Sequence, residues 1–257
     1  MYTTDKEAIR SNMIRIYELI AANSPLASVV KSSTFVRMDS EVNHPMFNRV
    51  LDYKVSKDID PAEEMKSIME SYESRGVLGF WLTYSHDSDP AIAEALAANG
   101  LVKRGAMSGM SLSLANWSYQ SPEISGLEIR LAQSERDFED FKEVFSGGFG
   151  VSDLCYQLFV GDSRHEPSFR FHVAYVNALP ACSVMTYLDG DVAGIYAVAT
   201  LEQRRRMGIG GAAVAHALRE AQAMGAKQSI LQASPMGKSV YQKLGYKEEL
   251  LIDLYSR

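Results

Sequence analysis

A short basic and glycine-rich segment contains the residues of this sequence best suited to bind a charged ligand. An apolar run over 192–201 leads into Arg205 and Arg206, and then into Gly208 and Gly210. Glycines let the backbone approach a ligand closely, free N–H groups at a helix start attract anions, and arginines add positive charge. The spacing therefore predicts a strand, a loop and a helix that together bind the pyrophosphate of a phosphorylated cofactor.

The same glycines also satisfy the dinucleotide fingerprint G-x-G-x-x-(G/A) over residues 208–213, which would indicate a nicotinamide or flavin site. That interpretation requires an acidic residue roughly 20 positions further on, to hold a ribose hydroxyl. This sequence has Ala233 and Ser234 there. Too little chain follows the motif for a doubly wound nucleotide domain, so we favour another phosphorylated cofactor.

A second motif follows the glycine-rich segment, after one expected helix and one expected strand. Residues 205–210 read R-x-x-G-x-G, an expected strand follows over 227–233, and residues 240–246 read Val-Tyr-Gln-Lys-Leu-Gly-Tyr. Together these motifs resemble the GCN5-related N-acetyltransferases (GNAT), whose acetyl-CoA site combines this loop, a following strand and a tyrosine in a Y-x-x-L-G-(F/Y) helix. The resemblance extends from Leu127 to the C-terminus.

Composition is consistent with this resemblance. The chain of 257 residues has 26 Lys and Arg against 32 Asp and Glu, a formal charge of −6. This charge disfavours nucleic acid as a partner and favours amines. No run reaches the roughly 18 apolar residues of a membrane helix, and charged residues interrupt any signal sequence, so we expect no membrane association. The cysteines Cys155 and Cys182 have no metal spacing, which indicates packed thiols in a reducing cytoplasm and no metal site.

Apolar periodicity and turn residues predict a mixed α/β fold in two halves, each a central mixed β-sheet flanked by helices. We expect a degenerate GNAT-like domain over 1–118, a linker over 119–126 and a catalytic domain over 127–257. In the first half, a helix begins near Thr4, and the other elements are strands at 28–38, 47–55, 78–84 and 101–114, with helices at 61–76 and 90–100. In the second half, strands are expected at 127–131, 171–176, 181–188, 192–201 and 227–233, with helices at 134–145, at 208–224 and from Ser234–Pro235. We expect Gly147 and Gly148 to end the helix at 134–145.

The two halves share an internal repeat. Pro90 lies ten residues before Gly100, and Pro235 lies ten residues before Gly245. In this alignment Leu96 takes the place of Tyr241, and residues 47–61 contain neither a glycine pair nor an arginine cluster. We therefore expect the first copy to be structural, as in other tandem members of the family, although capped helices are common enough for the similarity to arise by chance.

The resemblance implies a set of cofactor contacts. Two neighbouring strands should part, and the backbone of 198–200 should bond to the pantetheine arm as another strand would. Backbone N–H groups over 206–211 should hold the pyrophosphate, and Ser234 should touch the cofactor as well as capping a helix. Glu202 stands where many relatives have proline. The complete expected set is Val198, Ala199, Thr200, Arg205, Arg206, Met207, Gly208, Ile209, Gly210, Gly211 and Ser234.

The resemblance also implies that Tyr241 is the general acid. A phenol titrates near pH 10, so it stays protonated at neutral pH and can give its proton to the departing CoA thiolate. A core tyrosine packed beside Leu244 is the structural alternative.

The general base is not defined by the sequence. Strand 228–232 supplies no carboxylate, which leaves His172, Asp153, Glu202 or a water chain as candidates. Three further tyrosines could line the acceptor pocket or belong to the core: Tyr156, Tyr175 and Tyr187.

The expected protein is a cytoplasmic enzyme, monomeric or homodimeric, that transfers acetyl from acetyl-CoA to a primary amine of a small molecule or peptide. One alternative is a CoA-binding sensor or scaffold without turnover. The other is the dinucleotide oxidoreductase disfavoured above.

Overall fold

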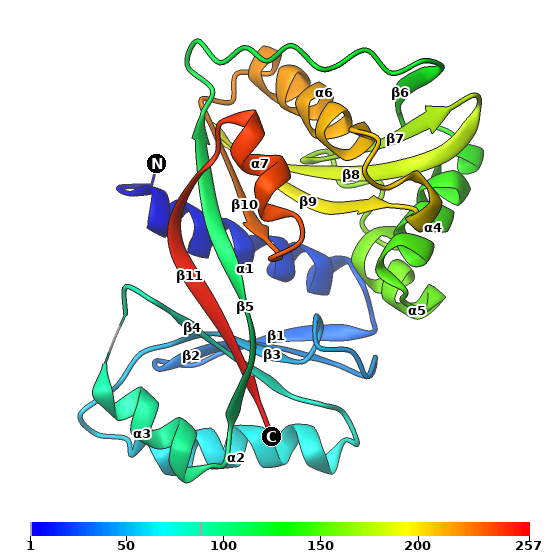
Figure 1. Ribbon diagram of the computed structural model, residues 1–257. Helices are drawn as coiled ribbons and strands as arrows, with labels where there is room; N and C mark the ends of the chain where they lie inside the picture. The colour runs from blue at the N-terminus through cyan, green and yellow to red at the C-terminus, as the bar shows by residue number, and fades with distance from the viewer. Residues whose placement is uncertain (1, 88) are drawn as a thin grey trace. The chain divides into compact units, whose positions relative to one another are not determined.

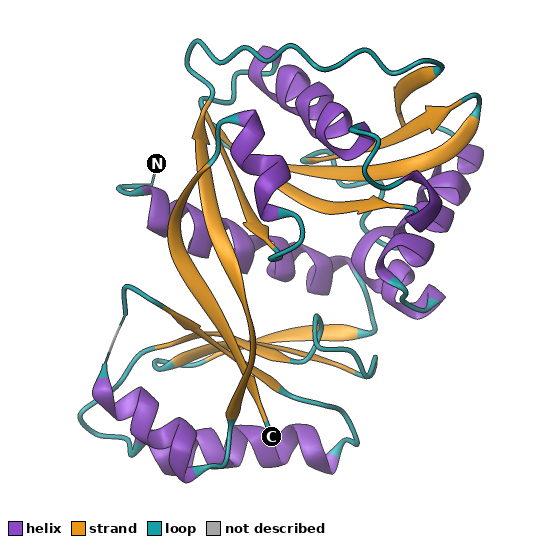
Figure 2. Ribbon diagram, viewed as in Figure 1, coloured by secondary structure: helices purple, strands orange, loops and turns teal. Residues whose placement is uncertain are grey.

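The computed structural model describes residues 2–87 and 89–257, which form two compact units (Figure 1). Unit 1 combines the start of the chain, as far as Met13, with Gly109–Glu249. Unit 2 consists of Ile14–Ser108 and Leu250–Arg257. Both units have a sheet flanked by helices, as the sequence predicts (Figure 2).

Unit 1 contains a sheet in the order β5-β10-β9-β8-β7-β6, in which β6 to β9 are antiparallel and β9 pairs with β10 in parallel. Its strands are β5 (Val102–Ser113, of which the end lies in unit 1), β6 (Leu127–Leu131), β7 (Phe169–Val176), β8 (Leu179–Asp189), β9 (Val192–Thr200) and β10 (Gln228–Ala233). Its helices are α4 (Glu135–Phe149), α5 (Asp153–Tyr156), the π-helical turn η1 (Gln157–Gly161), the 3-10 turn η2 (Glu202–Arg204), α6 (Ile209–Ala223) and α7 (Lys238–Leu244).

Side-chain alternation along the strands assigns the helices of unit 1 to the two faces of its sheet. Phe171 on β7 contacts Phe138 and Phe141 of α4, whereas the next residue, His172, contacts α6. On β9, Ala193 and Ile195 belong to the core cluster under α6. Successive strand residues point to opposite faces. We therefore place α4 on one face, and α6 with α7 on the other.

Helix α4 continues through Gly147 and Gly148, which were expected to end it. The helix ends at Phe149, and Gly150 closes it with a positive φ of 67°. A Cβ on Gly148 would lie 2.8 Å from the Cβ of Ala199 on β9. These glycines therefore serve close packing between the helix and the strand.

Helix α7 begins later than the sequence suggests. Residues 235–237 form a turn, and the helix starts at Lys238. The hydroxyl of Ser234 accepts a hydrogen bond from the N–H of Gly237 at 3.2 Å. Ser234 thus stabilises the turn that leads into the helix.

Unit 2 contains a sheet in the order β1-β2-β3-β4-β11. Its strands are β1 (Ala27–Lys31), β2 (Phe35–Ser40), β3 (Arg49–Tyr53), β4 (Phe80–Tyr84) and β11 (Lys247–Ser256, of which the end lies in unit 2), and its helices are the later part of α1 (Asp5–Asn23), α2 (Pro61–Ser74) and α3 (Pro90–Ala98). The strand expected over 28–38 is a hairpin, because the Ser32 hydroxyl accepts from the N–H groups of Thr34 and Phe35 and turns the chain.

The last strand explains why the units differ from the ranges expected from the sequence. Residues 252–255 of β11 pair antiparallel with β4, so the C-terminus belongs to unit 2. Residues 109–113 of β5 belong to unit 1. The residue pattern of β5 and β11 does not show that each strand is divided between the two units, because the division depends on contacts between residues far apart in the chain. Within residues 2–87 and 89–257, no helix combines the length and hydropathy that a membrane crossing requires.

Candidate active site

Strands β9 and β10 form a fork in the sheet of unit 1. They pair in parallel from Val192 and Gln228 only as far as Gly194 and Ile230, and the rest of each strand has no partner in the other. The sequence analysis expected two neighbouring strands to part. The fork begins at Gly194.

The unpaired end of β9 presents backbone groups to the open side of the fork. The N–H of Leu201 donates to the carbonyl oxygen of Ala181 at 3.1 Å, so Leu201 faces β8. Backbone groups alternate along a strand, and Val198 and Thr200 therefore face away from β8. A register shift between Ser183 and Met185, opposite Ala197 with its φ of 49°, marks a β-bulge just before this stretch.

The loop after β9 ends at an open helix N-terminus. Arg206 and Gly208 have φ values of 64° and 79°, and Gly208 precedes α6 without a side-chain capping bond. The first turn of α6 contains no acidic residue. The first N–H groups of a helix have no partner within the helix and carry partial positive charge. This end of α6 can therefore bind an anion.

Glycines let the start of α6 pack closely against its neighbours. A Cβ on Gly210 would come within 3.2 Å of the Thr200 hydroxyl, and one on Gly211 within 3.6 Å of Val240. Ile209 is buried, so it anchors the helix start in the core, while Met207 is exposed.

The two arginines of the loop have different surroundings. Arg205 donates through Nε to the carbonyl oxygen of Thr200 at 3.1 Å and through a terminal nitrogen to that of Gly148 at 3.0 Å. Its side chain therefore ties the loop to β9 and α4. Arg206 is exposed, so its guanidinium is accessible to solvent.

Tyr241 lies on α7, on the same face of the sheet as α6. It packs against the core cluster beneath α6 and contacts Tyr246 edge to face, with ring centroids 5.9 Å apart. Burial, with a smaller contribution from Cys182, raises the pKa of Tyr241 above its ordinary value. The hydroxyl thus keeps its proton at neutral pH.

Both cysteines are packed thiols, as expected. Cys155 and Cys182 are buried and free. Burial raises the pKa of the Cys182 thiol to about 12, so this sulfur is protonated and a poor nucleophile at neutral pH. Tyr241 and Cys182 are therefore both neutral at neutral pH.

The candidate bases lie in different surroundings. His172 is buried and bonded through Nε2 to Glu220 at 2.5 Å, and burial lowers its pKa despite that carboxylate. Asp153 pairs with Lys142 at 2.8 Å. Glu202 is exposed in the η2 turn.

The three tyrosines considered for the acceptor pocket are all buried. Tyr175 donates to Asp140 at 3.0 Å, and Tyr187 packs against Phe169. Only Tyr156 lines a described pocket.

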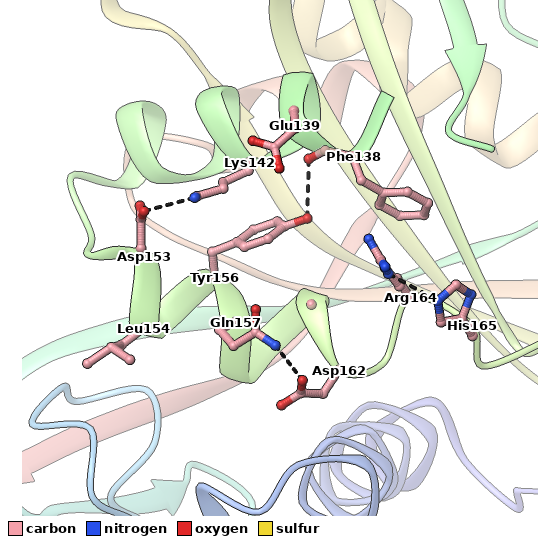
Figure 3. Close-up of a pocket in the computed structure, with 11 residues that line it drawn as sticks. Phe138, Glu139, Lys142, Asp153, Leu154, Tyr156, Gln157, Asp162, Arg164 and His165 are labelled. Atoms are coloured by element: carbon pink, nitrogen blue, oxygen red, sulfur yellow. Dashed lines mark hydrogen bonds and ion pairs between the residues drawn. The ribbon is translucent and has the colours of Figure 1, made fainter. Parts of the chain in front are cut away.

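That pocket has a volume of about 610 Å³ and lies between α4, α5 and η1 (Figure 3). The hydroxyl of Tyr156 donates to the carbonyl oxygen of Phe138 at 3.2 Å, which fixes the ring between the two helices. Glu139 and Lys142 line the α4 side. None of the residues expected to bind the cofactor lines this pocket. The described residues also contain no group of three His, Cys, Asp or Glu side chains arranged to hold a metal ion.

One polar residue beside the fork was missed by the sequence analysis. Asn12 of α1 is fully buried, and its Oδ1 accepts a hydrogen bond from the Tyr196 hydroxyl at 2.7 Å. A Cβ on Gly194 would lie 2.2 Å from the same Oδ1. Asn12 falls on the helix face that Ile9 and Ile16 bury, so a polar residue in an apolar stripe was the available signal.

Comparisons with known proteins show a family match over part of the chain and a similar fold over nearly all of it. Residues 135–246 match the model of the acetyltransferase (GNAT) family. The fold is similar over nearly the whole chain to that of a GCN5-related N-acetyltransferase from Kribbella flavida, with 17% identity, 95% of each chain covered and a TM-score of 0.69. No curated protein sequence matches the chain.

Two further solved structures support the same fold. A GCN5-related N-acetyltransferase from Sphaerobacter thermophilus has 14% identity and a TM-score of 0.66, with 96% of this chain and 93% of that one covered. A tandem GNAT protein from the clavulanic acid biosynthesis pathway has 12% identity and a TM-score of 0.62, covering 96% and 87%. The family model thus matches residues 135–246, and the fold of nearly the whole chain is similar to that of GNAT proteins, among them a tandem one.

Proposed function

We propose that this protein is an acetyl-CoA-dependent N-acetyltransferase that acetylates a primary amine by direct attack, with unit 1 as the catalytic domain. The observation that carries the proposal is the open N-terminus of α6 at the end of a forked strand pair. An anion-binding helix end and free strand backbone match the two parts of coenzyme A, a pyrophosphate and an amide-containing arm.

The residues present fit this cosubstrate. N–H groups over 206–211 would hold the pyrophosphate, with Arg206 as countercharge and Gly210 leaving the necessary space. The N–H groups of Val198 and Thr200 would bond to the pantetheine arm, in place of the strand that β10 no longer provides beyond Ile230. Arg205 would act indirectly, because its bonds to Thr200 and Gly148 hold the loop in shape.

Acetyl-CoA supplies the acyl group as a thioester. The amine nitrogen forms a bond to the acyl carbon, the carbon–sulfur bond breaks, the nitrogen loses a proton and the sulfur gains one. Tyr241 is the proposed donor of that second proton. Burial disfavours charged forms, so it raises the basicity of a departing thiolate as well as the pKa of the phenol.

Unit 2 has the proposed role of a degenerate copy that gives structural support. The proposal also places the protein in the cytoplasm, as a monomer or homodimer. These points rest on the resemblance and on composition, and they do not affect the chemistry proposed for unit 1.

Thermal unfolding in the presence of acetyl-CoA, CoA or NADH tests the cofactor assignment. A ligand at a hundred times its Kd adds about 2.7 kcal/mol to stability, so a shift with both CoA forms and none with NADH is expected. Stabilisation by NADH alone would overturn the proposal in favour of a dinucleotide enzyme.

Thiol release from acetyl-CoA, measured over a panel of primary amines, tests catalysis. Release that depends on the amine is the expected result. Tight CoA binding without release for any amine would instead identify a sensor or scaffold. That alternative is consistent with strand β10, which supplies no carboxylate base.

A further inference from the structure

Asn12 has an unsatisfied hydrogen-bond donor in the interior of unit 1. The residue has 0% of its surface exposed, and its Nδ2 has no partner. Leaving a buried donor unpaired costs about 1–3 kcal/mol, and most buried polar atoms in folded proteins are paired. An asparagine in this environment is therefore unfavourable unless another group accepts from Nδ2.

A second buried asparagine has both polar atoms of its side chain paired. Asn48 in unit 2 also has 0% exposure, but its Oδ1 accepts from the N–H of Ser40 at 2.9 Å and its Nδ2 donates to the carbonyl oxygen of Val42 at 2.8 Å. Asn48 is satisfied by the fold alone. Asn12 is satisfied at its oxygen only.

The position of Asn12 connects this free donor with the fork. Gly194 is the last β9 residue paired with β10, and any side chain there would collide with the Asn12 amide. Tyr196, two residues further along β9, bonds to the same amide. Asn12 thus lies directly against the strand segment where the fork opens.

The face of the sheet indicates which substrate Asn12 would meet. Gly194 and Tyr196 pair with Tyr187 and Met185, so they belong to the face opposite Ile195, which packs beneath α6. In the proposed function, α6 and Tyr241 bind the cosubstrate and its sulfur from the other face. An amine attacking the acyl carbon from the side opposite α6 would therefore approach on the face of Asn12.

We infer that Asn12 is a specificity residue whose Nδ2 binds an oxygen of the amine acceptor, so that the acceptor is an amino alcohol, amino sugar or amino-acid derivative rather than a plain alkylamine. The inference rests on the proposed acetyl transfer. Only an electron-pair donor can satisfy an amide N–H, and a hydrocarbon chain at this point would leave it unpaired. Tyr196 keeps the amide oriented by occupying Oδ1.

Matched amine pairs test this. Ethanolamine and n-propylamine differ by a hydroxyl in place of a methyl group, and glucosamine and cyclohexylamine form a second, larger pair. For the wild type, kcat/KM should favour the oxygen-bearing member by about tenfold, the value of one hydrogen bond of ordinary strength. Equal kcat/KM values for both members would overturn the inference.

The double variant Asn12→Leu/Tyr196→Phe removes both hydrogen-bonding partners at once, so it leaves neither side chain with a buried polar atom that lacks a partner. We expect it to fold, to keep the wild-type Kd for CoA and to lose the preference, mainly through a higher KM for the oxygen-bearing amines. Asn23→Leu, at an exposed asparagine of the same helix, is the matched control and should keep the preference. An unchanged preference in the double variant would show that Asn12 binds water only.

Direct binding separates failure of this inference from failure of the proposed function. Saturation-transfer NMR of the same amines, with CoA present, requires no turnover. If no amine is acetylated, the proposed function fails. Weaker ethanolamine binding in the double variant than in the wild type would still support the role of Asn12, and equal binding would overturn it.

Discussion

The N-terminal ends of α6 and α2 follow the same kind of strand in the two units and have opposite chemistry. Each helix links two strands that pair in parallel, β9 with β10 and β3 with β4. Helix α6 starts after Gly208 without a side-chain cap. Helix α2 is closed by Asp60, which accepts from the N–H of Ala62 at 2.8 Å, and it has two glutamates in its first turn. A capped acidic end repels an anion, whereas an open glycine-rich end attracts one.

The strands that precede these helices, β3 and β9, differ in how tightly they are packed. All five residues of β3 are buried, and the Tyr84 hydroxyl donates to the carbonyl oxygen of Leu51 at 2.7 Å. Tyr53 of β3 and Trp81 of β4 pack against each other, with ring centroids 5.1 Å apart. In unit 1 the corresponding end of β9 has small residues, and the N–H groups of Val198 and Thr200 face away from β8. One strand arrangement is therefore filled by large side chains in unit 2 and lined by small ones in unit 1, and the proposed ligand site depends on this difference.

The largest expected effect is at Gly210, where the open helix end would be blocked. Gly210→Val should weaken CoA binding at least about a hundredfold, or ~2.7 kcal/mol, because the side chain would occupy phosphate space. Calorimetric titration with CoA measures this. Gly105→Val is the matched control, since a Cβ there meets nothing within 4 Å, and it should bind CoA normally. Tight binding by the Gly210 variant would remove the distinction between α6 and α2.

Tyr241 is the next test, because unit 2 has Leu96 at the corresponding place in the repeat. Tyr241→Phe should lower kcat by roughly a hundredfold, typical of lost general-acid catalysis, and leave the Kd for CoA unchanged. Since burial raises the pKa of Tyr241, its ionisation should not reduce the activity of the wild type below about pH 10. Tyr119→Phe, at a half-buried tyrosine of the same unit, is the control. Unaltered turnover in the Tyr241 variant would assign that residue to packing.

The sequence predicted the strand, loop and helix of β9 and α6 because the signals for them are local. Glycines, arginines and a following apolar helix pattern lie within a few residues, and each acts on its own stretch of backbone. The bonds of Arg205 to Thr200 and Gly148 were not predictable, since they depend on how α4 packs on β9. The division of β5 and β11 between the two units was not predictable either, and neither was the contact of Asn12 with Gly194. Both bring together residues that are far apart in the chain.

A smaller effect is expected at Asp60, and only on stability. Asp60→Ala removes the α2 cap and should lower the free energy of unfolding by about 1 kcal/mol, the usual value of an N-cap. Urea unfolding followed by circular dichroism measures the change. Asp58→Ala, at an exposed aspartate beside it, should have almost no effect. The CoA affinity of both variants should equal that of the wild type, and a loss of affinity on removing the cap would show that unit 2 contributes to the ligand site.

The smallest expected effect concerns the pH dependence of stability, and it too should differ between the units. Burial lowers the pKa of His172 in unit 1, and it lowers that of the half-buried His44 in unit 2. The unfolded chain, in which histidine titrates near 6.5, then binds more protons than the folded protein at any pH between the two pKa values. Stability is therefore present above about pH 6.5 and is lost as the pH falls through that interval.

Comparing variants between pH 7.5 and 5.5 assigns this loss to a unit. The drop in unfolding free energy over this range should be smaller for His172→Gln than for the wild type, because glutamine takes up no proton. His44→Gln should change the drop less, since desolvation is weaker at a half-exposed ring. An identical drop in the wild type and the His172 variant would mean that Glu220, bonded to the ring, offsets desolvation and keeps the pKa of His172 near its unfolded value.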